Sequence, residues 1–406
     1  YIAWVQNLKW DWSISRQRYF GIAIPVWYCK SCGSPIFASR KQLPVNPLET
    51  ECQEKCECGC EEFIPEKAVF DTWVTSSITP QINERFGLKL TPMSMRTHAH
   101  EIIRTWTFYS IVRSLYHTGE IPWKDLMISG FVLAKKGEKL SKSKSNSLLD
   151  PALLISTHSA DALRYWSANA KLGTDTFFDV DELATSKRFM TKLWNACRFV
   201  ISQLEDADPS RTPALLPVDR WIIERTNETY RQASSLLCEY ELGSARHAID
   251  ELFWKDLCDN YIEIVKSRLY KPDIHGYEER RSGQFALYYS LLGILKMYAI
   301  YVPHITDYIY TKFFQQHEEA RSIHLLKWPQ DSAGDEKILL FGEEVKRVVF
   351  CMRKQKSEKN LSMRAEIEVL EVECEEEFVV WFEQTSRDLQ ACAHAREVKV
   401  RPTPTL

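Results

Sequence analysis

The sequence has 406 residues, 45% of them hydrophobic and 12% aromatic, and a formal net charge of −3. This length predicts about two to four domains, and the composition argues against a disordered chain. Because the net charge is close to zero, any binding of nucleic acid must rest on local basic patches. No apolar run is long enough to cross a bilayer, and no signal-peptide pattern follows Tyr1.

The first third of the chain mixes strand-like runs with one long helix. Short β-like runs occupy residues 1–28, such as 20–27, and a cysteine-rich segment follows at 29–62. A helix is expected at about 98–117, with Ile102, Trp106, Tyr109 and Leu115 near one face. The apolar run 126–133 predicts a buried strand. The order strand, helix, strand predicts a parallel α/β sheet.

The rest of the chain is predominantly helical. Asp150 followed by Pro151 predicts the start of a helix, with aspartate as the cap and proline at the first helical position. Long amphipathic helices, which together predict a helical bundle, are expected at 181–204, 218–240, 242–268 and 283–314, the last interrupted by Pro303. After Pro329 a helix with basic residues at 346–356 and strands at 365–370 and 398–400 predict a small α/β domain.

Half of the twelve cysteines lie between residues 29 and 60. Cys29, Cys32 and Gly33 have the C-x-x-C-G form of a zinc knuckle, in which the glycine lets backbone amides turn toward the sulfurs. A second group follows at Cys52, Cys56, Cys58 and Cys60. Two such pairs can hold one zinc ion through four thiolates and stabilise a segment that has few apolar residues. Disulfides or spare thiols are the alternative, which the absence of a secretion signal disfavours.

The second pair of this site is open to more than one choice. We favour Cys56 and Cys58, because a glycine follows Cys58 as it follows the second cysteine of the first knuckle. Cys52 or Cys60 can replace one of them. The other cysteines are expected to be reduced, buried small hydrophobes: Cys197, Cys238, Cys258, Cys351, Cys374 and Cys392.

A lysine-rich and serine-rich segment spans residues 137–146, directly after the run 126–133. Lys139 and Lys142 can reach one polyphosphate from two sides, and small serines between them permit tight turns and offer hydroxyl groups. The alternative is a solvated linker, and composition alone favours that alternative.

A resemblance reverses this preference. The sequence Lys139-Leu-Ser-Lys142-Ser143 resembles the KMSKS motif of class I aminoacyl-tRNA synthetases. Other segments resemble the same family in the same order. Residues 71–77, Asp-Thr-Trp-Val-Thr-Ser-Ser, are similar to the D-T-W-x-x-S-S block of valyl-tRNA synthetases. Residues 11–21 resemble the segment that follows the editing insertion of the family, and residues 100–106 resemble the helix start that faces the adenylate. Residues 220–221 and 253–263 resemble parts of the anticodon-binding bundle.

The resemblance implies a fold and a domain order. The expected fold class is α/β: the Rossmann-like second half of a class I synthetase catalytic domain with a zinc-knuckle insertion, then an all-α anticodon-binding helical bundle and a small C-terminal α/β domain. The expected boundaries are 1–150 for the catalytic half with 29–62 inserted, 151–185 for a connecting helical and stem-contact segment, 186–330 for the bundle and 331–406 for the C-terminal domain.

The resemblance also implies an activity and its site. A valyl-type enzyme uses ATP with Mg²⁺ to activate valine and then transfers the valine to tRNA(Val). The resemblance also implies that the protein is a monomer in the cytoplasm, binds a structural Zn²⁺ and does not associate with a membrane. Catalytic contacts to the ATP phosphates are implied for Lys139 and Lys142. The residues implied to contact the adenylate are His100, Glu101, Gly130, Ser141 and Ser143. Those implied to contact the valine side chain are Trp73, Ile102 and Trp106. The implied zinc ligands are Cys29, Cys32, Cys56 and Cys58.

Two departures from the family pattern bear on activity. Ser145 stands where the family often has glycine, and no HIGH-type motif occurs in the sequence. The editing domain is also absent. The sequence therefore predicts the C-terminal part of a longer enzyme, which is inactive alone. The alternatives are a fragment of an isoleucyl-tRNA synthetase, or a non-catalytic tRNA-binding protein derived from a synthetase.

Overall fold

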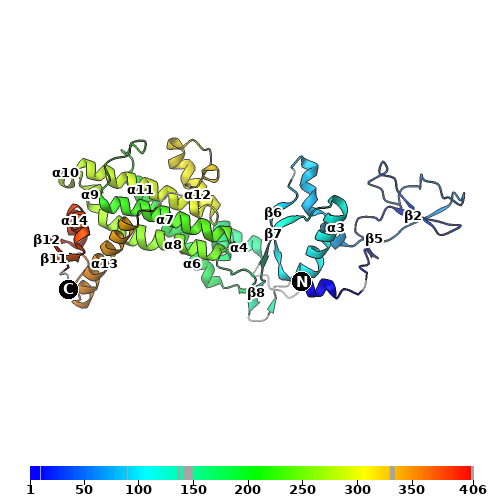
Figure 1. Cartoon of the computed structure of the whole chain (residues 1–406), viewed down its shortest axis with the longest axis horizontal. Helices are drawn as coiled ribbons and strands as arrows, with labels where there is room; N and C mark the ends of the chain where they lie inside the picture. The colour runs from blue at the N-terminus through cyan, green and yellow to red at the C-terminus, as the bar shows by residue number, and fades with distance from the viewer. Residues whose placement is uncertain (10, 89, 136–137, 140–149, 330–333, 404–406) are drawn as a thin grey trace. The chain divides into compact units, whose positions relative to one another are not determined.

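The computed structural model describes the chain except for residues 10, 89, 136–137, 140–149, 330–333 and 404–406 (Figure 1). The chain divides into two compact units. Unit 1 comprises residues 1–131 with 172–174, and unit 2 comprises 132–171 with 175–406. The boundaries expected at residues 150, 185 and 330 divide the chain differently and stay predictions. Among the described residues, no helix combines the length and apolar character needed to cross a membrane.

The centre of unit 1 is a pair of parallel strands joined through a helix. Strand β6 (Met93–Ala99) pairs with β7 (Trp123–Ser129), in a register that sets Met93 opposite Trp123 and Ala99 opposite Ser129. The connection runs through a 3₁₀ turn (His100–Ile102), a π turn (Ile103–Thr107) and helix α3 (Phe108–Thr118). The predicted order strand, helix, strand with parallel pairing is therefore present.

Two details of this prediction were wrong. The helix does not begin at residue 98, because His98 and Ala99 are still paired with Ile128 and Ser129 at the end of β6. The run 126–133 is not one buried strand: β7 ends at Ser129, and β8 (Val132–Lys135) belongs to a different sheet. Residues 126–128 are only partly buried.

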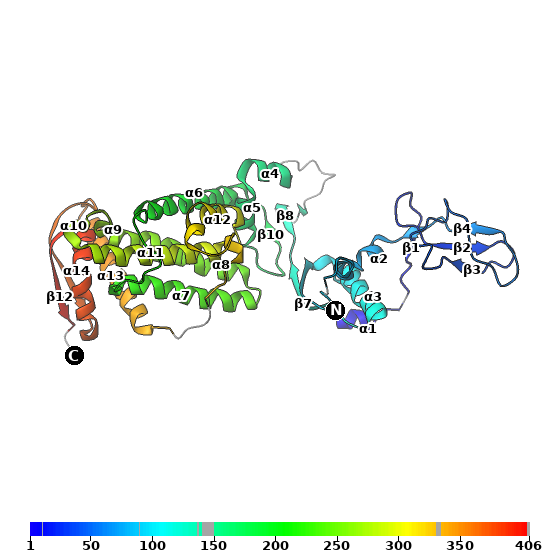
Figure 2. The same ribbon diagram turned by 90° about the horizontal axis from the view of Figure 1, so that it is seen from above.

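The remainder of unit 1 consists of short elements. They are α1 (Ile2–Gln6), β1 (Ser15–Arg16) paired antiparallel with β5 (Val69–Phe70), α2 (Thr72–Ser76) and a 3₁₀ segment (Thr79–Phe86). The cysteine-rich segment forms a three-stranded antiparallel sheet with β2 (Val26–Cys29) between β3 (Pro35–Phe37) and β4 (Phe63–Pro65) (Figure 2). Of the run 20–27, only Val26 and Trp27 lie in this sheet.

Unit 2 begins with a small sheet and two helices. Strand β8 lies between β9 (Glu138–Lys139) and β10 (Thr176–Phe177). Helices α4 (Pro151–His158) and α5 (Ala160–Ser167) follow. The Asp150 carboxylate accepts a hydrogen bond from the Ala152 N–H group at 2.9 Å, so the predicted cap and the proline at the first helical position are both confirmed.

The predicted bundle is present, with its helices close to the expected ranges. They are α6 (Val180–Gln203), α7 (Pro217–Cys238), α8 (Leu242–Glu251), a π segment (Leu252–Tyr261), α9 (Ile262–Tyr270), α10 (Pro272–His275), α11 (Tyr277–Tyr298), α12 (Pro303–Ile309) and a second π segment (Tyr310–Phe314). Two 3₁₀ turns follow, Gln315–His317 and Ile323–Leu325. The last helical stretch begins at Tyr277, not at 283, and α12 starts at Pro303, which lacks an N–H group to continue α11.

The chain ends in helices that pack on a two-stranded sheet. They are α13 (Glu336–Glu358), β11 (Ile367–Cys374), a 3₁₀ turn (Glu376–Phe378), α14 (Val379–Ala393) and β12 (Ala395–Pro402), with β11 and β12 parallel. One cluster of buried apolar side chains extends from Tyr165 through the bundle to Ala393. The bundle and the last seventy or so residues therefore share a hydrophobic core, although they were expected as separate domains.

Candidate functional site

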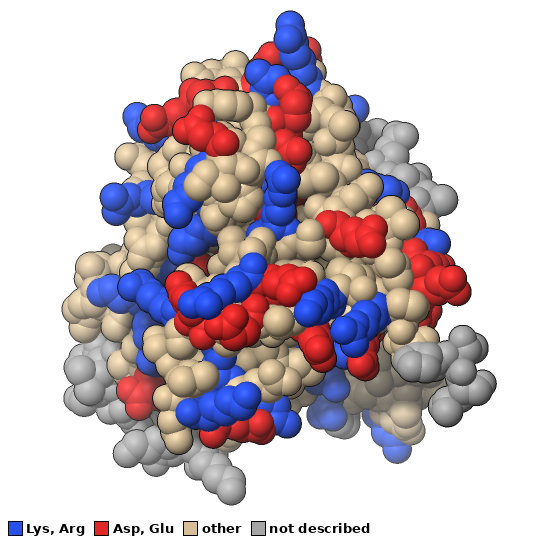
Figure 3. Space-filling view, turned by 90° about the vertical axis from the view of Figure 1, so that its left-hand side faces the viewer, with Lys and Arg blue, Asp and Glu red and all other residues tan. Residues whose placement is uncertain are grey.

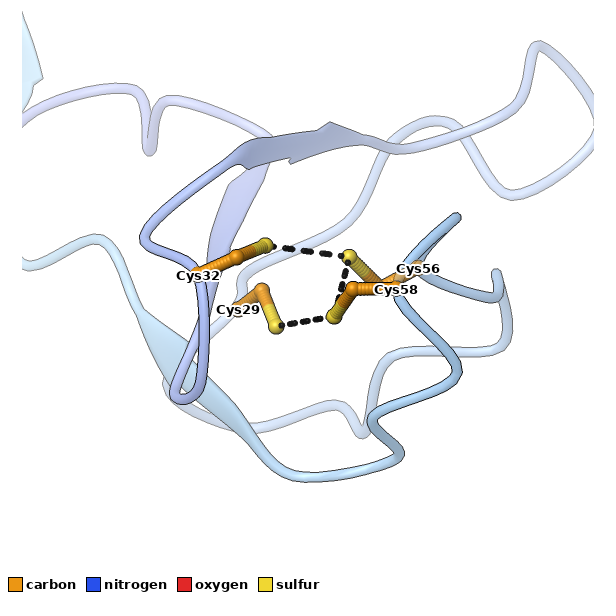
Figure 4. Close-up of side chains that lie close together, drawn as sticks. All are labelled: Cys29, Cys32, Cys56 and Cys58. Carbon is orange, nitrogen blue, oxygen red and sulfur yellow. Dashed lines mark hydrogen bonds between the residues drawn. The ribbon is translucent and has the colours of Figure 1, made fainter.

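The best-defined candidate site in unit 1 is a cluster of four cysteine sulfurs (Figure 4). Cys29 ends β2 and Cys32 lies in the turn after it, whereas Cys56 and Cys58 come from the loop before β4. The sulfur of Cys29 lies 3.5 Å from that of Cys58, and the sulfur of Cys32 lies 3.5 Å from that of Cys56. All four sulfurs lie within 4.8 Å of one another.

This spacing suits a tetrahedral zinc ion. Zinc–sulfur bonds of about 2.3 Å in a tetrahedron separate the sulfurs by roughly 3.8 Å, which is close to the distances found here. A glycine closes a turn after each cysteine pair: Gly33 N–H donates to Cys29 O, four residues before it, and Gly59 N–H donates to Cys56 O, three residues before it, both at 2.9 Å. Both glycines have positive φ, at 73° and 83°, a conformation that favours glycine. Each cysteine pair is therefore followed by a glycine in a turn that needs its left-handed conformation.

The other two cysteines of the segment lie outside the cluster. The Cys52 thiol donates to Glu54 O at 3.7 Å, and the Cys60 thiol donates to Glu62 O at 3.6 Å. The alternatives that the sequence left open are therefore not favoured by the geometry, which brings Cys56 and Cys58 to the first knuckle.

The first knuckle also stabilises thiolates. The backbone N–H group of Cys32, together with that of Ser31, lowers the pKa of the Cys29 thiol to about 6. The hydroxyl and the backbone N–H group of Ser34 lower the pKa of Cys32. Because a thiolate is the form that binds metal, these hydrogen bonds favour the required charge state at Cys29 and Cys32. The neighbouring thiols and burial instead raise the pKa of Cys56 to about 12 and raise that of Cys58.

The segment that carries Trp73 is held by a buried aspartate. Asp71 is 3% exposed, caps α2 by accepting from Trp73 N–H at 2.8 Å, and forms an ion pair with Arg16 of β1. Arg16 also donates to Ser13 O and Ser15 O. The partners of Arg16 all lie within unit 1, so the guanidinium braces β1 against the start of α2. The ion pair joins residues 55 positions apart, so local spacing carried no signal for it.

Trp106 ties this segment to the turn after β6. Its ring Nε1–H donates to Ser76 O at 3.1 Å, at the end of α2. The ring stacks on Trp123 at 5.4 Å between centroids, and the Arg96 guanidinium lies 5.0 Å from its centroid. Trp106 is only 6% exposed. Its ring is therefore packed among residues of β6, β7 and α2, and Trp123 and Arg96 are neighbours that sequence reasoning missed.

The other two residues of the expected valine pocket are more accessible. Trp73 in α2 and Ile102 in the 3₁₀ turn are both partly buried. We expected Ile102 and Trp106 on one face because they are four residues apart. That reasoning was wrong, because a 3₁₀ turn and then a π turn occupy residues 100–107, and α-helical spacing does not apply to them.

The residues expected near the adenylate follow the carboxyl ends of the parallel strands. His100 and Glu101 begin the turn after β6, both exposed, and Gly130 follows the end of β7. The His100 ring meets the ring of Phe131 edge-on at 4.5 Å between centroids. In open parallel sheets, this edge is where ligands bind, so the three residues lie where a nucleotide site is expected.

The lysine-rich segment falls mainly outside the described residues. Lys139 belongs to β9, which pairs antiparallel with β8. Ser141, Lys142, Ser143 and Ser145 all lie outside the described part of the chain. Their expected contacts to ATP stay predictions.

Comparison with known proteins places these features in one family. Residues 1–179 match the family described as tRNA synthetases class I (I, L, M and V), and residues 219–372 match the anticodon-binding domain of tRNA ligase. The chain is 39% identical to the valine–tRNA ligase of Orientia tsutsugamushi over 91% of its length and 46% of that protein. It is 37% identical to that of Methanopyrus kandleri over 98% of its length and 44% of that protein.

A solved structure agrees at the level of the fold. The ternary complex of Agrobacterium radiobacter K84 agnB2 LeuRS with tRNA and LeuAMS has a TM-score of 0.61 and 19% identity, covering 81% of this chain and 42% of that one. The chain spans about half the length of the curated relatives it matches. On the two family matches and these identities, the chain belongs to the class I aminoacyl-tRNA synthetases.

Proposed function

We propose that this chain is part of a valine–tRNA ligase, which forms valyl-adenylate from valine and ATP with Mg²⁺ and then transfers valine to tRNA(Val). The observation that carries this proposal is the match, at 36–39% identity over at least 91% of the chain, to several proteins named valine–tRNA ligase. The block Asp71–Ser77 supports it, because its tryptophan lies on a helix that the partly buried Arg16–Asp71 ion pair holds in place.

In this proposal the valine side chain binds beside Trp73 and Ile102, with Trp106 behind them. The partial burial of Trp73 and Ile102 suits residues that contact a ligand, whereas Trp106 acts through its hydrogen bond to Ser76 O and holds α2 against the π turn. A small apolar pocket of this kind selects by size, and one methylene is worth about 1–3 kcal/mol there.

The activation step would rest on positioning and charge. His100, Glu101 and Gly130 would contact the adenylate at the carboxyl ends of β6 and β7, and Gly130 would let the adenine approach the backbone. Lys139, Ser141, Lys142 and Ser143 would close on the ATP phosphates, where ammonium groups stabilise the charge that moves onto the leaving pyrophosphate. Magnesium would enter with ATP and neutralise phosphate charge.

We also propose that Cys29, Cys32, Cys56 and Cys58 hold a structural zinc ion. Four sulfurs within 4.8 Å of one another and a glycine turn after each cysteine pair support this assignment. The zinc would stabilise the small β2–β4 sheet and take no part in the reaction, since four protein ligands leave no open position.

The bundle would bind tRNA(Val), and residues 151–185 would connect it to the catalytic half. Helix α5 is anchored for such a role: the Arg164 guanidinium donates to Ile300 O at 2.8 Å, and the Asp161 carboxylate accepts from Ile305 N–H at 2.7 Å at the start of α12. We also propose that the enzyme is a monomer and acts in the cytoplasm.

The test is ATP–pyrophosphate exchange by the complete enzyme that contains this chain. Exchange stimulated by valine, and at least tenfold less by isoleucine, is expected from the loss of fit for one extra methylene. Equal or stronger stimulation by isoleucine would assign the isoleucyl activity instead. No exchange with either amino acid, together with retained tRNA binding, would favour a non-catalytic tRNA-binding protein.

A further inference from the structure

Buried polar side chains fix a structure more firmly than exposed ones, because no water can replace their partners. On the end of unit 2 shown in Figure 3, basic and acidic side chains are interspersed over the surface, and exposed pairs contribute little to stability. The ammonium of Lys356, which is 2% exposed, instead holds the backbone by donating to Met363 O, Ala365 O and Ala393 O at 2.7–2.9 Å. In unit 1 a buried hydroxyl group, that of Thr107, pairs with His98 beside the proposed activation site.

His98 lies near the carboxyl end of β6 and forms two hydrogen bonds through its ring. Its Nδ1 lies 2.6 Å from Ala99 O, and its Nε2 lies 2.7 Å from the hydroxyl oxygen of Thr107. Because a carbonyl oxygen only accepts, Nδ1 carries a proton, and Nε2 of the neutral ring then accepts from the Thr107 hydroxyl group. The ring therefore joins the residue before the 3₁₀ turn to the last residue of the π turn.

The segment between these two points, residues 100–106, carries most of the side chains proposed to bind the amino acid and the adenylate. They are His100, Glu101, Ile102 and Trp106. A 3₁₀ turn has poorer hydrogen-bond geometry than an α-helix, and a π turn is rare and found mostly at functional sites. The path of this segment therefore depends on side chains that hold it from outside, and His98 holds both of its ends.

Burial makes the bond between His98 and Thr107 obligatory. Thr107 is 3% exposed, and among the described residues its hydroxyl group pairs with His98 alone. A buried hydroxyl group that loses its partner is destabilised. Loss of the imidazole would therefore drive the end of the π turn toward another position.

His98 also contacts the tryptophan behind the proposed valine pocket. Its ring meets that of Trp106 at 5.9 Å between centroids, with the planes at 64°. Trp123 stacks on the same tryptophan, and the Arg96 guanidinium lies 5.0 Å from its centroid. Arg96 and His98 are two residues apart in β6, so their side chains extend from the same face of the strand. The position of the Trp106 ring thus depends on His98 through direct contact as well.

From this geometry we propose that His98 is a positioning residue for both halves of the activation site. Through Ala99 O and Thr107 it sets the path of residues 100–106, and through Trp106 it sets the depth of the valine pocket. It acts through these residues and without contact to a substrate. The inference rests on the proposed valine–tRNA ligase function and adds a residue that determines its selectivity.

The test measures kcat and KM of ATP–pyrophosphate exchange, with valine and with isoleucine, in the complete enzyme that contains this chain. His98→Phe keeps an aromatic ring and removes both hydrogen bonds. It should lower kcat/KM for valine by roughly 10–100-fold and raise KM for valine. It should also lower the ratio of kcat/KM for valine to that for isoleucine by about threefold or more. A smaller folded fraction would lower the apparent kcat and leave KM and this ratio unchanged, so the measurement separates positioning from stability.

Two further variants and a control identify the hydrogen bond. His98→Gln should recover most of the loss, because its amide oxygen can accept from the Thr107 hydroxyl group. Thr107→Val keeps the shape of the side chain and should show a smaller loss than His98→Phe. The double variant of His98→Phe and Thr107→Val should be no worse than His98→Phe alone, because both changes remove the same bond. His117→Phe, at an exposed histidine of α3, is the matched control and should leave kcat, KM and the ratio unchanged.

Each outcome bears on a separate claim. A lower kcat in His98→Phe with the wild-type KM and ratio would overturn the proposal and leave His98 a role in stability only. Additive losses in the double variant would also overturn it, since the two residues would then not act through one bond. Activation of isoleucine in place of valine by the wild-type enzyme would contradict the proposed function, and the change in KM for isoleucine would then decide the role of His98.

Discussion

At the scale of single residues, the most informative side chains are buried and charged. Arg268 in α9 and Asp219 in α7 are at most 1% exposed and pair with each other, and Asp388 of α14 lies 3.2 Å from the Arg268 guanidinium. Tyr261 and Ser282 also donate to Asp219. Burial makes these partners obligatory, because one charge left alone in the core would be strongly destabilising.

Lys356→Met should lower the free energy of unfolding by about 2–4 kcal/mol, because it leaves three backbone carbonyls without their donor while keeping a side chain of similar length. Urea unfolding measures the effect. Lys354→Met, on the same helix at a side chain that is 62% exposed, should change the free energy by no more than about 0.5 kcal/mol. Equal effects of the two changes would show that the buried ammonium is not needed.

Asp388 predicts a dependence of stability on pH. Burial raises the pKa of its carboxyl to about 7, above the value of about 3.9 expected in the unfolded chain. The folded state therefore binds more protons between these values, and the contribution of Asp388, complete below about pH 4, is lost as pH rises toward about 7.

The measurement compares urea unfolding of the wild-type chain and Asp388→Asn at about pH 5 and about pH 8. The stability of the variant relative to wild type should rise between these values, because asparagine does not titrate. Asp259→Asn, at an exposed carboxylate, is the control and should show no such trend. A pH-independent difference between wild type and Asp388→Asn would contradict the assignment.

At the scale of elements, the cysteine segment depends on its turns more than on its core. The three short strands β2, β3 and β4 bury few side chains, chiefly Val26, Trp27 and Cys29. A sheet of three short strands needs a buried hydrophobic face to be stable by itself. A metal that joins the two knuckles would therefore supply much of the stability of the element, and apparent binding free energies of roughly 10–16 kcal/mol are typical of such sites.

Cys58→Ser should reduce bound zinc from about one ion per chain to a small fraction, because it removes one of four thiolates. Cys60→Ser is the matched control, since its sulfur lies outside the cluster and donates to Glu62 O. Elemental analysis after gentle purification measures the metal content. Equal zinc content in both variants would contradict the ligand set, and zinc lost only from Cys60→Ser would assign Cys60 in place of Cys58.

At the scale of the whole molecule, the chain contains two compact units with different means of stabilisation. Unit 1 has a two-stranded parallel sheet, and parallel sheets are normally covered on both faces and extended by further strands. Unit 2 has one extended apolar core that includes the last helix and sheet. We therefore expect unit 2 to be the more stable unit.

The chain by itself should not catalyse valine-dependent ATP–pyrophosphate exchange. The sequence holds no HIGH-type motif, which in the family supplies histidines for the ATP phosphates. Exchange by the purified chain should be at the background rate, while binding of tRNA(Val), measured by filter retention, should be detectable. Exchange well above background would show that the residues in this chain suffice for the activation step.

Much of this protein could be predicted from the sequence because the decisive signals are local. The bundle helices follow from amphipathic spacing, the cap at Asp150 from two adjacent residues, and the first knuckle from Cys29, Cys32 and Gly33. The pairing of β6 with β7 follows from the order strand, helix, strand. In each case the residues that determine the structure lie within one or two turns of one another, or in one short crossover.

The tertiary structure decided what local spacing cannot specify. It brought Cys56 and Cys58, not Cys52 or Cys60, to the first knuckle. It paired Arg16 with Asp71 and placed Lys356 among three carbonyls. It also merged the last helix and sheet with the core of the bundle. The identity of a cysteine, an arginine or a lysine shows which interactions its side chain can form, but not with which residue. The partner depends on how distant segments pack when the chain buries its apolar surface.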